Sequence, residues 1–317
     1  MYELKDNIKN VLVSGAAGDI GIALGRILQE ENILNILGCD IFSDHAGECV
    51  FNTFIQIPRA DHRDYFSSLK HIFTDYNIEL FIPSSEAEIK AVIDYGLRDQ
   101  CLFGVPVLIA NEETVLIALD KLSTARYLKK NNIKAPWTIS VLDGSPIALP
   151  CIFKPRSGQG SKGLEIVYST ARATELEGTI GYIWQELLLP NEQEYTCGVY
   201  RDLQGNCRSI LMKRTLDGGF TGKGEVVENK NVTLYVETIA TVLNVKGAVN
   251  FQLRLTSTGP VLFEINPRFS STVMFRHKLG FTDLVWSIEE RLGLPISNYL
   301  APQSGIKFYR GSCEYIK

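Results

Sequence analysis

Short apolar segments alternate with longer amphipathic ones over the first third of the chain. Apolar residues recur at helical spacing after the glycine-rich turn at 15–21, over 61–75, where Asp61 is the expected cap, and over 85–95. Apolar runs predict buried strands at residues 11–14, 35–41, 79–83 and 106–110. This alternation predicts a parallel sheet with helices on both faces and a ligand crevice at the carboxyl ends of its strands.

The pattern changes after residue 111. Helix starts are predicted at Asn111 and Asp120, and further helices over 231–243 and 282–292. Strands now follow one another with short connections, which predicts antiparallel sheets; they lie at 151–155, 164–168, 182–186, 194–200, 208–213, 248–255, 261–266 and from 307 onward. We therefore expect an α/β part followed by an α+β part, divided into residues 1–110, 111–190 and 191–317.

Composition disfavours several classes of function. The 317 residues carry 32 Lys and Arg against 36 Asp and Glu, a net charge of −4 without a basic block, so we expect no nucleic-acid partner. The seven cysteines are scattered without a C-x-x-C pair, which disfavours a disulfide framework or zinc site and favours a reducing compartment. No apolar run reaches the ~18 residues of a membrane span. We expect a cytoplasmic protein that acts on small molecules and not at a membrane.

Two glycine-rich loops compete as phosphate sites. The first places Gly15, Gly18 and Gly21 between a strand and a helix, with Asp40 some 20 positions further on, as in dinucleotide-binding folds. Glycines at these positions also serve close helix–strand packing without any ligand. Because the chain shows no second mononucleotide half, we favour the packing interpretation, and an NAD(P)-binding oxidoreductase remains the alternative.

The second loop runs from Lys154 to Gly163 and connects two strands. Three glycines with flanking lysines let backbone N–H groups close over phosphates beside the ammonium charges. No Gly-Lys-Ser/Thr opens a helix there, so the loop is not a Walker A motif. A solvated basic turn explains the glycines less well.

Polar residues gather on one face of the strand pair 248–255 and 261–266. Alternation puts Asn250, Gln252 and Arg254 on one face of the first strand, and Glu264 and Asn266 opposite Val261, Phe263 and Ile265 on the second. If Leu255 pairs with Val261, then Gln252 lies opposite Glu264 and Asn250 opposite Asn266. Carboxylate and amide oxygens together suit Mg²⁺. A solvent-facing polar strand is the alternative.

The segment Phe263-Glu-Ile-Asn-Pro-Arg268 resembles the E-x-N-x-R signature of the ATP-grasp superfamily, and of carbamoyl phosphate synthetase large-chain relatives in particular. The other pieces of the family follow in the same order: Asp120-Lys121, the loop 154–163, Gln185-Glu186-Leu187-Leu188 and Glu194-Tyr195. The resemblance implies a Rossmann-like pre-ATP-grasp domain over 1–110, linker helices and a small ATP-grasp lobe over 111–190, and a large lobe over 191–317.

Residue roles follow from this resemblance. It implies catalytic roles for Lys154 and Arg268, and metal contacts to Mg²⁺ (Mn²⁺ as an alternative) from Glu264, Asn266 and Gln252, where several relatives have a second acid. It implies that ATP is contacted by Lys121, Lys154, Ser157, Gly158, Gly160, Ser161, Gly163, Gln185, Glu186, Leu187, Leu188 and Glu194. Glu186 to Leu188 resemble the adenine-reading hinge and Glu194 the ribose acceptor.

The implied activity is an ADP-forming carboxylate–amine ligase. ATP would phosphorylate a carboxylate, and an amine would then displace phosphate from the acyl phosphate. A non-catalytic ATP-binding regulatory module is a second alternative, and the resemblance also implies a homodimer. Two points stay open: whether the glycine-rich segment 216–225 is a closing lid or a surface loop, and whether Lys213 or Arg214 faces the site.

Overall fold

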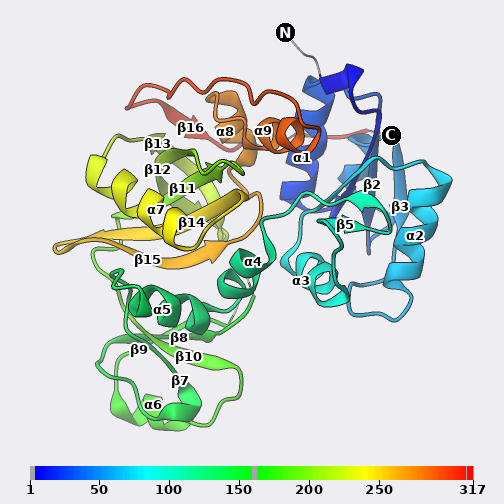
Figure 1. Cartoon of the computed structure of the whole chain (residues 1–317). Coiled ribbons are helices and arrows are strands. Elements are labelled where there is room, and N and C mark those ends of the chain that lie inside the picture. The colour runs from blue at the N-terminus through cyan, green and yellow to red at the C-terminus, as the bar shows by residue number, and fades with distance from the viewer. Residues whose placement is uncertain (1–3, 159–162, 312, 317) are drawn as a thin grey trace.

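The computed structural model describes residues 4–158, 163–311 and 313–316. Its N-terminal part contains a parallel sheet in the order β3 (Thr53–Gln56), β2 (Asn35–Asp40), β1 (Asn10–Ser14) and β4 (Leu80–Pro83). The connecting helices are α1 (Asp19–Glu30), α2 (Tyr65–Asp75) and α3 (Glu86–Tyr95), and short 3-10 helices lie at Leu4–Asp6 and Ala46–Cys49. Figure 1 shows this domain at the right.

Alternating residues of β1 divide the helices between the two faces of this sheet. Val11 and Val13 pack in one cluster with α1, whereas Leu12 packs in another cluster with Leu69 of α2 and Val92 of α3. This is the period-2 alternation of a strand buried on both faces. The parallel sheet with helices on both faces is as predicted.

Three details of this domain differ from the sequence prediction. The strand β3 was not expected. Helix α2 begins at Tyr65, after Asp64, whose side chain makes no capping hydrogen bond, and the expected cap Asp61 accepts a 3.2 Å bond from Nε of Arg59 instead. The predicted strand 106–110 is reduced to a hairpin of β5 (Cys101–Leu102) and β6 (Val105–Pro106) plus one parallel bridge between Phe81 and Val107. Pro106 has no N–H to donate to a longer ladder.

The small lobe is a four-stranded antiparallel sheet that follows two helices. Helices α4 (Glu112–Ala118) and α5 (Lys121–Lys130) lead into β7 (Thr138–Ser140) and a 3-10 turn at Val141–Asp143. The sheet order is β7, β10 (Tyr182–Glu186), β8 (Cys151–Pro155) and β9 (Glu165–Val167), and α6 (Thr170–Leu176) packs on it. The segment 182–186 therefore belongs to another sheet than 194–200, although the sequence suggested neighbouring strands.

The large lobe is built on a six-stranded antiparallel sheet. Its strand order is β15 (Gly259–Asn266), β14 (Gly247–Thr256), β11 (Glu194–Arg201), β12 (Cys207–Asp217), β13 (Phe220–Val226) and β16 (Lys307–Tyr309). Helix α7 (Lys230–Val242) packs on one face, against residues such as Val199 and Val249. Segment 216–225 is the end of the β12–β13 hairpin, with Gly218 and Gly219 at its turn, and not an irregular loop.

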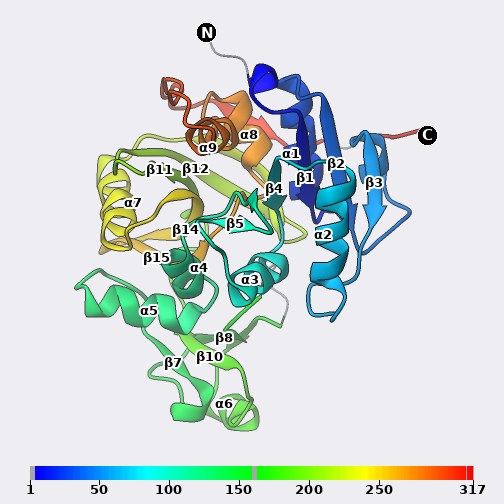
Figure 2. The ribbon, with the colours of Figure 1, turned by 45° about the vertical axis from the view of Figure 1, so that its right-hand side comes forward.

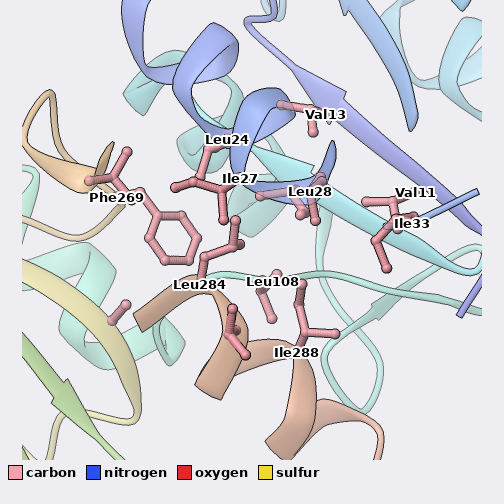
Figure 3. Packing of buried hydrophobic residues seen from close by; sticks show 14 of the residues in the cluster. Val11, Val13, Leu24, Ile27, Leu28, Ile33, Leu108, Phe269, Leu284 and Ile288 are labelled. Carbon is pink, nitrogen blue, oxygen red and sulfur yellow. The ribbon is translucent and has the colours of Figure 1, made fainter. Parts of the chain in front are cut away.

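A shared core joins the first domain to the large lobe. Leu24 and Ile27 of α1 lie in the same buried cluster as Phe269 and as Leu284 and Ile288 of α9 (Asp283–Arg291), as Figure 3 shows. Helix α8 (Val273–Lys278) lies beside α9, and both views place α1 next to this pair (Figure 2). The position of the parallel sheet relative to the large lobe is thus set by apolar packing. In the part of the chain that the structure describes, no helix is long and apolar enough to cross a bilayer.

Candidate functional site

One large cavity of about 1020 Å³ lies where the three parts of the chain meet. The first domain contributes the carboxyl ends of β1 and β2, the small lobe contributes β8 and β10, and the large lobe contributes one face of β11, β12, β14 and β15. Among the lining residues are these from the predicted set: Lys121, Lys154, Ser157, Gly158, Gln185, Glu186, Leu188, Glu194, Gln252 and Glu264. Residues that are distant in sequence thus meet around one space.

Lys154 is a buried cation that lines this cavity. Its side chain is only 5% exposed, and its ammonium lies 5.8 Å from the centre of the Phe263 ring. Burial lowers the pKa of Lys154 to about 8, the carboxylate of Glu264 opposes this shift, and the positive charge of Lys121 adds to it. The charged form of Lys154 is therefore short of negative partners, and an anion in the cavity would stabilise it.

Lys121 and Asp120 both contact residues at the start of the glycine-rich loop. The ammonium of Lys121 donates a 2.7 Å hydrogen bond to the carbonyl oxygen of Gly158. Asp120 caps α5 by accepting from the backbone N–H of Leu122 at 3.0 Å, and it also forms an ion pair with the guanidinium of Arg156. The Asp-Lys pair thus ties a helix start to the loop that follows β8.

The end of the loop is fixed by a glycine. Gly163 has a φ of +72°, and a Cβ there would lie 2.9 Å from the hydroxyl of Tyr182, so a larger residue is disfavoured by both backbone and space. Gly160 and Ser161 lie outside the described residues, and their predicted nucleotide contacts stay predictions.

The segment that links the two lobes follows β10. Gln185 is 2% exposed, and its Nε2 donates to the hydroxyl of Thr138 at 3.0 Å. Glu186 accepts at Oε2 from the backbone N–H of Trp137 at 3.2 Å, and Arg254 donates to the carbonyl oxygen of Leu188 at 2.6 Å. Leu187 is half-buried and is not among the residues that line the cavity.

Glu194 is held between two arginines. Its Oε1 accepts from Nε and Nη2 of Arg214 at 3.1 and 2.8 Å, and its Oε2 accepts from Nη2 of Arg254 at 2.6 Å. The three side chains are 15%, 8% and 12% exposed in that order. Arg214 also donates to Oε1 of Gln252 at 3.0 Å, so it is Arg214 that points into the cavity wall.

Sequence reasoning left open whether Lys213 or Arg214 faces the site, and it assigned no role to Arg254. Alternation had placed Arg254 on the same face as Gln252, and this was the available signal for it. The position of Arg214 depends on pairing across two strands, Glu194 with Arg254 on β14 and Tyr195 with Lys213 on β12, which the sequence alone does not provide.

The register of β14 and β15 brings the predicted polar pairs together. Gln252 lies opposite Glu264, and Asn250 lies opposite Asn266, as predicted. The assumed pairing of Leu255 with Val261 is wrong, because a bulge next to Gln252 shifts the register and Leu255 pairs with Pro260.

The same bulge turns the side chain of Phe263 toward the cavity. This residue was expected to share a face with Val261 and Ile265, but it lines the cavity together with Glu264. Leu262 instead joins Ile265 in the buried cluster below α7. The extra residue on one strand thus turns two consecutive side chains toward the site.

Asn266 and Arg268 lie beside the large cavity and are not among its lining residues. Arg268 donates to Oδ1 of Asn266 at 3.0 Å, to Oε1 of Glu86 at 3.0 Å and to the carbonyl oxygen of Phe269 at 3.1 Å. Because Glu86 belongs to α3, this contact joins the first domain to the E-x-N-x-R segment at residues 263–268, called the signature segment below. The metal role of Asn266 and the catalytic role of Arg268 remain predictions.

The acids facing the cavity limit how a metal could be held. Within residues 4–158, 163–311 and 313–316, no group of three or more His, Cys, Asp or Glu side chains is placed to hold a metal ion. Of the predicted metal contacts, Glu264 and Gln252 line the cavity. Oxygens for a complete coordination sphere would have to come from a ligand or from water.

The first glycine loop lines the same cavity, but its residues already have structural roles. A Cβ on Gly21 would lie 2.4 Å from the carbonyl oxygen of Gly15. The carboxylate of Asp40 accepts from the backbone N–H of Ala17 at 2.9 Å and from that of Phe42 at 3.2 Å. These contacts favour the packing interpretation of this loop over dinucleotide binding.

Comparison with known proteins supports the assignment of the fold. Residues 185–310 match a family model described as "ATP-grasp in the biosynthetic pathway with Ter operon". No curated protein sequence matches the chain significantly.

Solved structures resemble the chain over nearly its full length. N5-carboxyaminoimidazole ribonucleotide synthetase from Thermus thermophilus is similar with a TM-score of 0.72 at 14% identity, over 94% of this chain and 81% of that one. N5-carboxyaminoimidazole synthetase from Staphylococcus aureus complexed with ADP has a TM-score of 0.71 at 16% identity, over 92% and 80%. L-amino acid ligase from Bacillus licheniformis has a TM-score of 0.69 at 15% identity, over 90% and 74%. The family match over residues 185–310 and these structures agree on an ATP-grasp fold for this chain.

Proposed function

We propose that this protein is an ATP-dependent, ADP-forming ligase that activates a carboxylate as an acyl phosphate and couples it to an amine. The observation that carries the proposal is the joint presence of Lys154, Glu186, Glu194 and Glu264 around one cavity. A cavity of about 1020 Å³ has the size of pockets that bind nucleotide-sized ligands. Structures similar to this chain include a synthetase complexed with ADP and an amino acid ligase.

The cavity walls suit the parts of ATP in the order that the resemblance implies. The segment Glu186 to Leu188, which links the two lobes, offers backbone groups for the adenine. Glu194, the ribose acceptor that the resemblance implies, follows at the start of β11. The charge of Lys154 interacts with those of Lys121 and Glu264, so phosphates at this part of the cavity would find positive charge. We assign the triphosphate to this end of the cavity.

The proposed chemistry has two displacement steps. A carboxylate oxygen of the substrate attacks the terminal phosphorus of ATP, and the bond to the leaving ADP oxygen breaks. The amine nitrogen then attacks the acyl carbon, phosphate leaves, and the amine loses a proton. Lys154 neutralises charge on the transferred phosphoryl group and the surrounding side chains orient the reactants, since phosphoryl transfer needs no covalent enzyme group.

The donor set is compatible with Mg²⁺ in the way that nucleotide sites use it. Glu264 supplies a carboxylate at the cavity wall, and Mg²⁺ takes one or two carboxylates with phosphate oxygens and water. When bound, the ion would neutralise phosphate charge, and Glu264 is the residue that we assign to hold it. The Oε1 of Gln252 already accepts from Arg214, which makes Gln252 the weaker candidate.

The test begins with ligand-dependent melting temperature. We expect Mg²⁺ with a non-hydrolysable ATP analogue to raise the melting temperature by a few degrees at 100 times its dissociation constant, and NADH and NADPH to have no effect. ADP release is then measured with panels of carboxylates and amines in the wild type and in Glu264→Gln. A shift with NADH alone, or undiminished ADP release in Glu264→Gln, would contradict the proposal. Nucleotide binding without ADP release for any substrate pair would favour the non-catalytic alternative.

A further inference from the structure

A second, smaller cavity of about 240 Å³ lies between the first domain and the large lobe. The first domain side is lined by Pro83, Ile89 and Gln100, and the large lobe side by residues on both sides of Gly247 and on α9. Arg268 lines this cavity as well, and it is not among the lining residues of the nucleotide cavity. The nucleotide site and the second cavity are thus distinct spaces that meet at the signature segment.

Two cationic residues, Arg291 and Lys246, line this cavity. Within the described residues, Arg291 and Lys246 form no ion pair within 4.0 Å. Arg291 is half-buried and donates only to neutral acceptors, the side-chain carbonyl of Gln100 and, at 3.4 Å, the backbone carbonyl of Val107. Burial lowers the pKa of the Arg291 guanidinium below its ordinary value, and the negative charge of Glu290 opposes this shift.

Glu290, the acid that lines the cavity, forms its hydrogen bonds with groups other than Arg291 and Lys246. Glu290 accepts from the hydroxyl of Tyr200 at 3.1 Å and from the backbone N–H of Leu203 at 2.7 Å. The charge of Glu290 compensates only in part for the reduced hydration of the Arg291 guanidinium, because burial outweighs it in the net lowering of the pKa of Arg291. A bound anion would recover this loss.

The size of the cavity restricts what that anion can be. A water molecule occupies about 30 Å³, so a space of about 240 Å³ holds a compact oxyanion and a few waters but not a nucleotide. A planar guanidinium matches the paired oxygens of phosphate or carboxylate. We infer that this interdomain cavity binds a compact oxyanion, phosphate or a small carboxylate, between Arg291 and Lys246, and that the anion strengthens the docking of the first domain on the large lobe.

The experiment compares melting temperatures in phosphate, acetate and chloride at equal ionic strength. Phosphate or acetate should raise the melting temperature by a few degrees at 100 times its dissociation constant. The rise should disappear in Arg291→Gln, shrink in Lys246→Gln, and persist in Arg291→Lys, which keeps the charge. Lys129→Gln, an exposed charge removal on α5, should behave like the wild type. The phosphate and acetate arms show which oxyanion is preferred.

A matched variant separates this site from the nucleotide cavity. Phosphate bound near Lys154 would lose its effect in Lys154→Gln and keep it in Arg291→Gln, and that result would overturn the inference. The absence of any shift in the wild type would also overturn it. Because the readout requires neither ATP nor turnover, the inference can fail while the proposed ligase function stands.

Discussion

The ammonium of Lys121 donates a 2.7 Å hydrogen bond to the carbonyl oxygen of Gly158, at the start of the glycine-rich loop. A helix start from the linker region thereby holds the loop that is expected to cover the phosphates. We expect Lys121→Met to weaken binding of a non-hydrolysable ATP analogue by about tenfold, since a charged hydrogen bond contributes ~1.5 kcal/mol or more. Isothermal titration calorimetry measures this, with Lys129→Met on the exposed face of the same helix as control. Equal affinity in both variants would refute the role of Lys121.

Lys154 should make nucleotide binding depend on pH. Its pKa in the free protein is about 8 because of burial, and phosphates would raise it in the complex. Below this pKa the ammonium is charged in the free protein and in the complex, so it adds no pH dependence to the nucleotide affinity. Above it, binding requires proton uptake, so the affinity should fall by about tenfold per pH unit until the pKa of the complex is reached. Binding titrations between about pH 7 and pH 10 test this.

The matched variants for Lys154 are Lys154→Met and Lys154→Arg. The first should bind weakly at all pH values without this slope, and the second should stay charged and also lack the slope. A slope that persists in Lys154→Met would assign the titration to another group.

Glu194 should matter more for stability than either arginine beside it. It is the only carboxylate bonded to both Arg214 and Arg254 among the described contacts, so Glu194→Gln leaves two nearly buried cations together. We expect a loss of ~3 kcal/mol in the free energy of unfolding, and a smaller loss for Arg254→Met, which leaves the Arg214 pair intact. Urea denaturation of both single variants and of the double variant provides the comparison. A larger loss in Arg254→Met would reverse this assignment.

Glu86 should affect turnover more than nucleotide binding. It bonds to Arg268 at 3.0 Å across the domain boundary, outside the walls of the nucleotide cavity. In Glu86→Gln the Arg268 guanidinium loses the carboxylate that it contacts on α3, and we expect it to be held less firmly beside Asn266. We expect kcat to fall about tenfold with an unchanged dissociation constant for the ATP analogue, as for an interaction used at the reacting end of the site. An equal weakening of nucleotide binding would point to a general effect on the fold.

The sequence by itself determined the local elements and one cross-strand pairing. The spacing of apolar residues located most of the helices and strands, because period and caps are properties of neighbouring residues, but it missed β3, β5, β7, α6, β13 and α8. Alternation on β14 and β15 placed Gln252 opposite Glu264, and the ordered motifs implied the ATP-grasp fold that the comparisons support. The division at residues 110 and 190 and a homodimer stay predictions.

The tertiary structure decided which side chains meet. It separated β10 from β11 into two sheets, turned Phe263 toward Glu264 through a bulge, and directed Arg214 and Arg254 onto Glu194. It also bonded Arg268 to Glu86, 182 positions away in the chain. Such contacts depend on how whole sheets and domains pack, and packing is selected by apolar burial over many residues at once, which no local pattern of spacing contains.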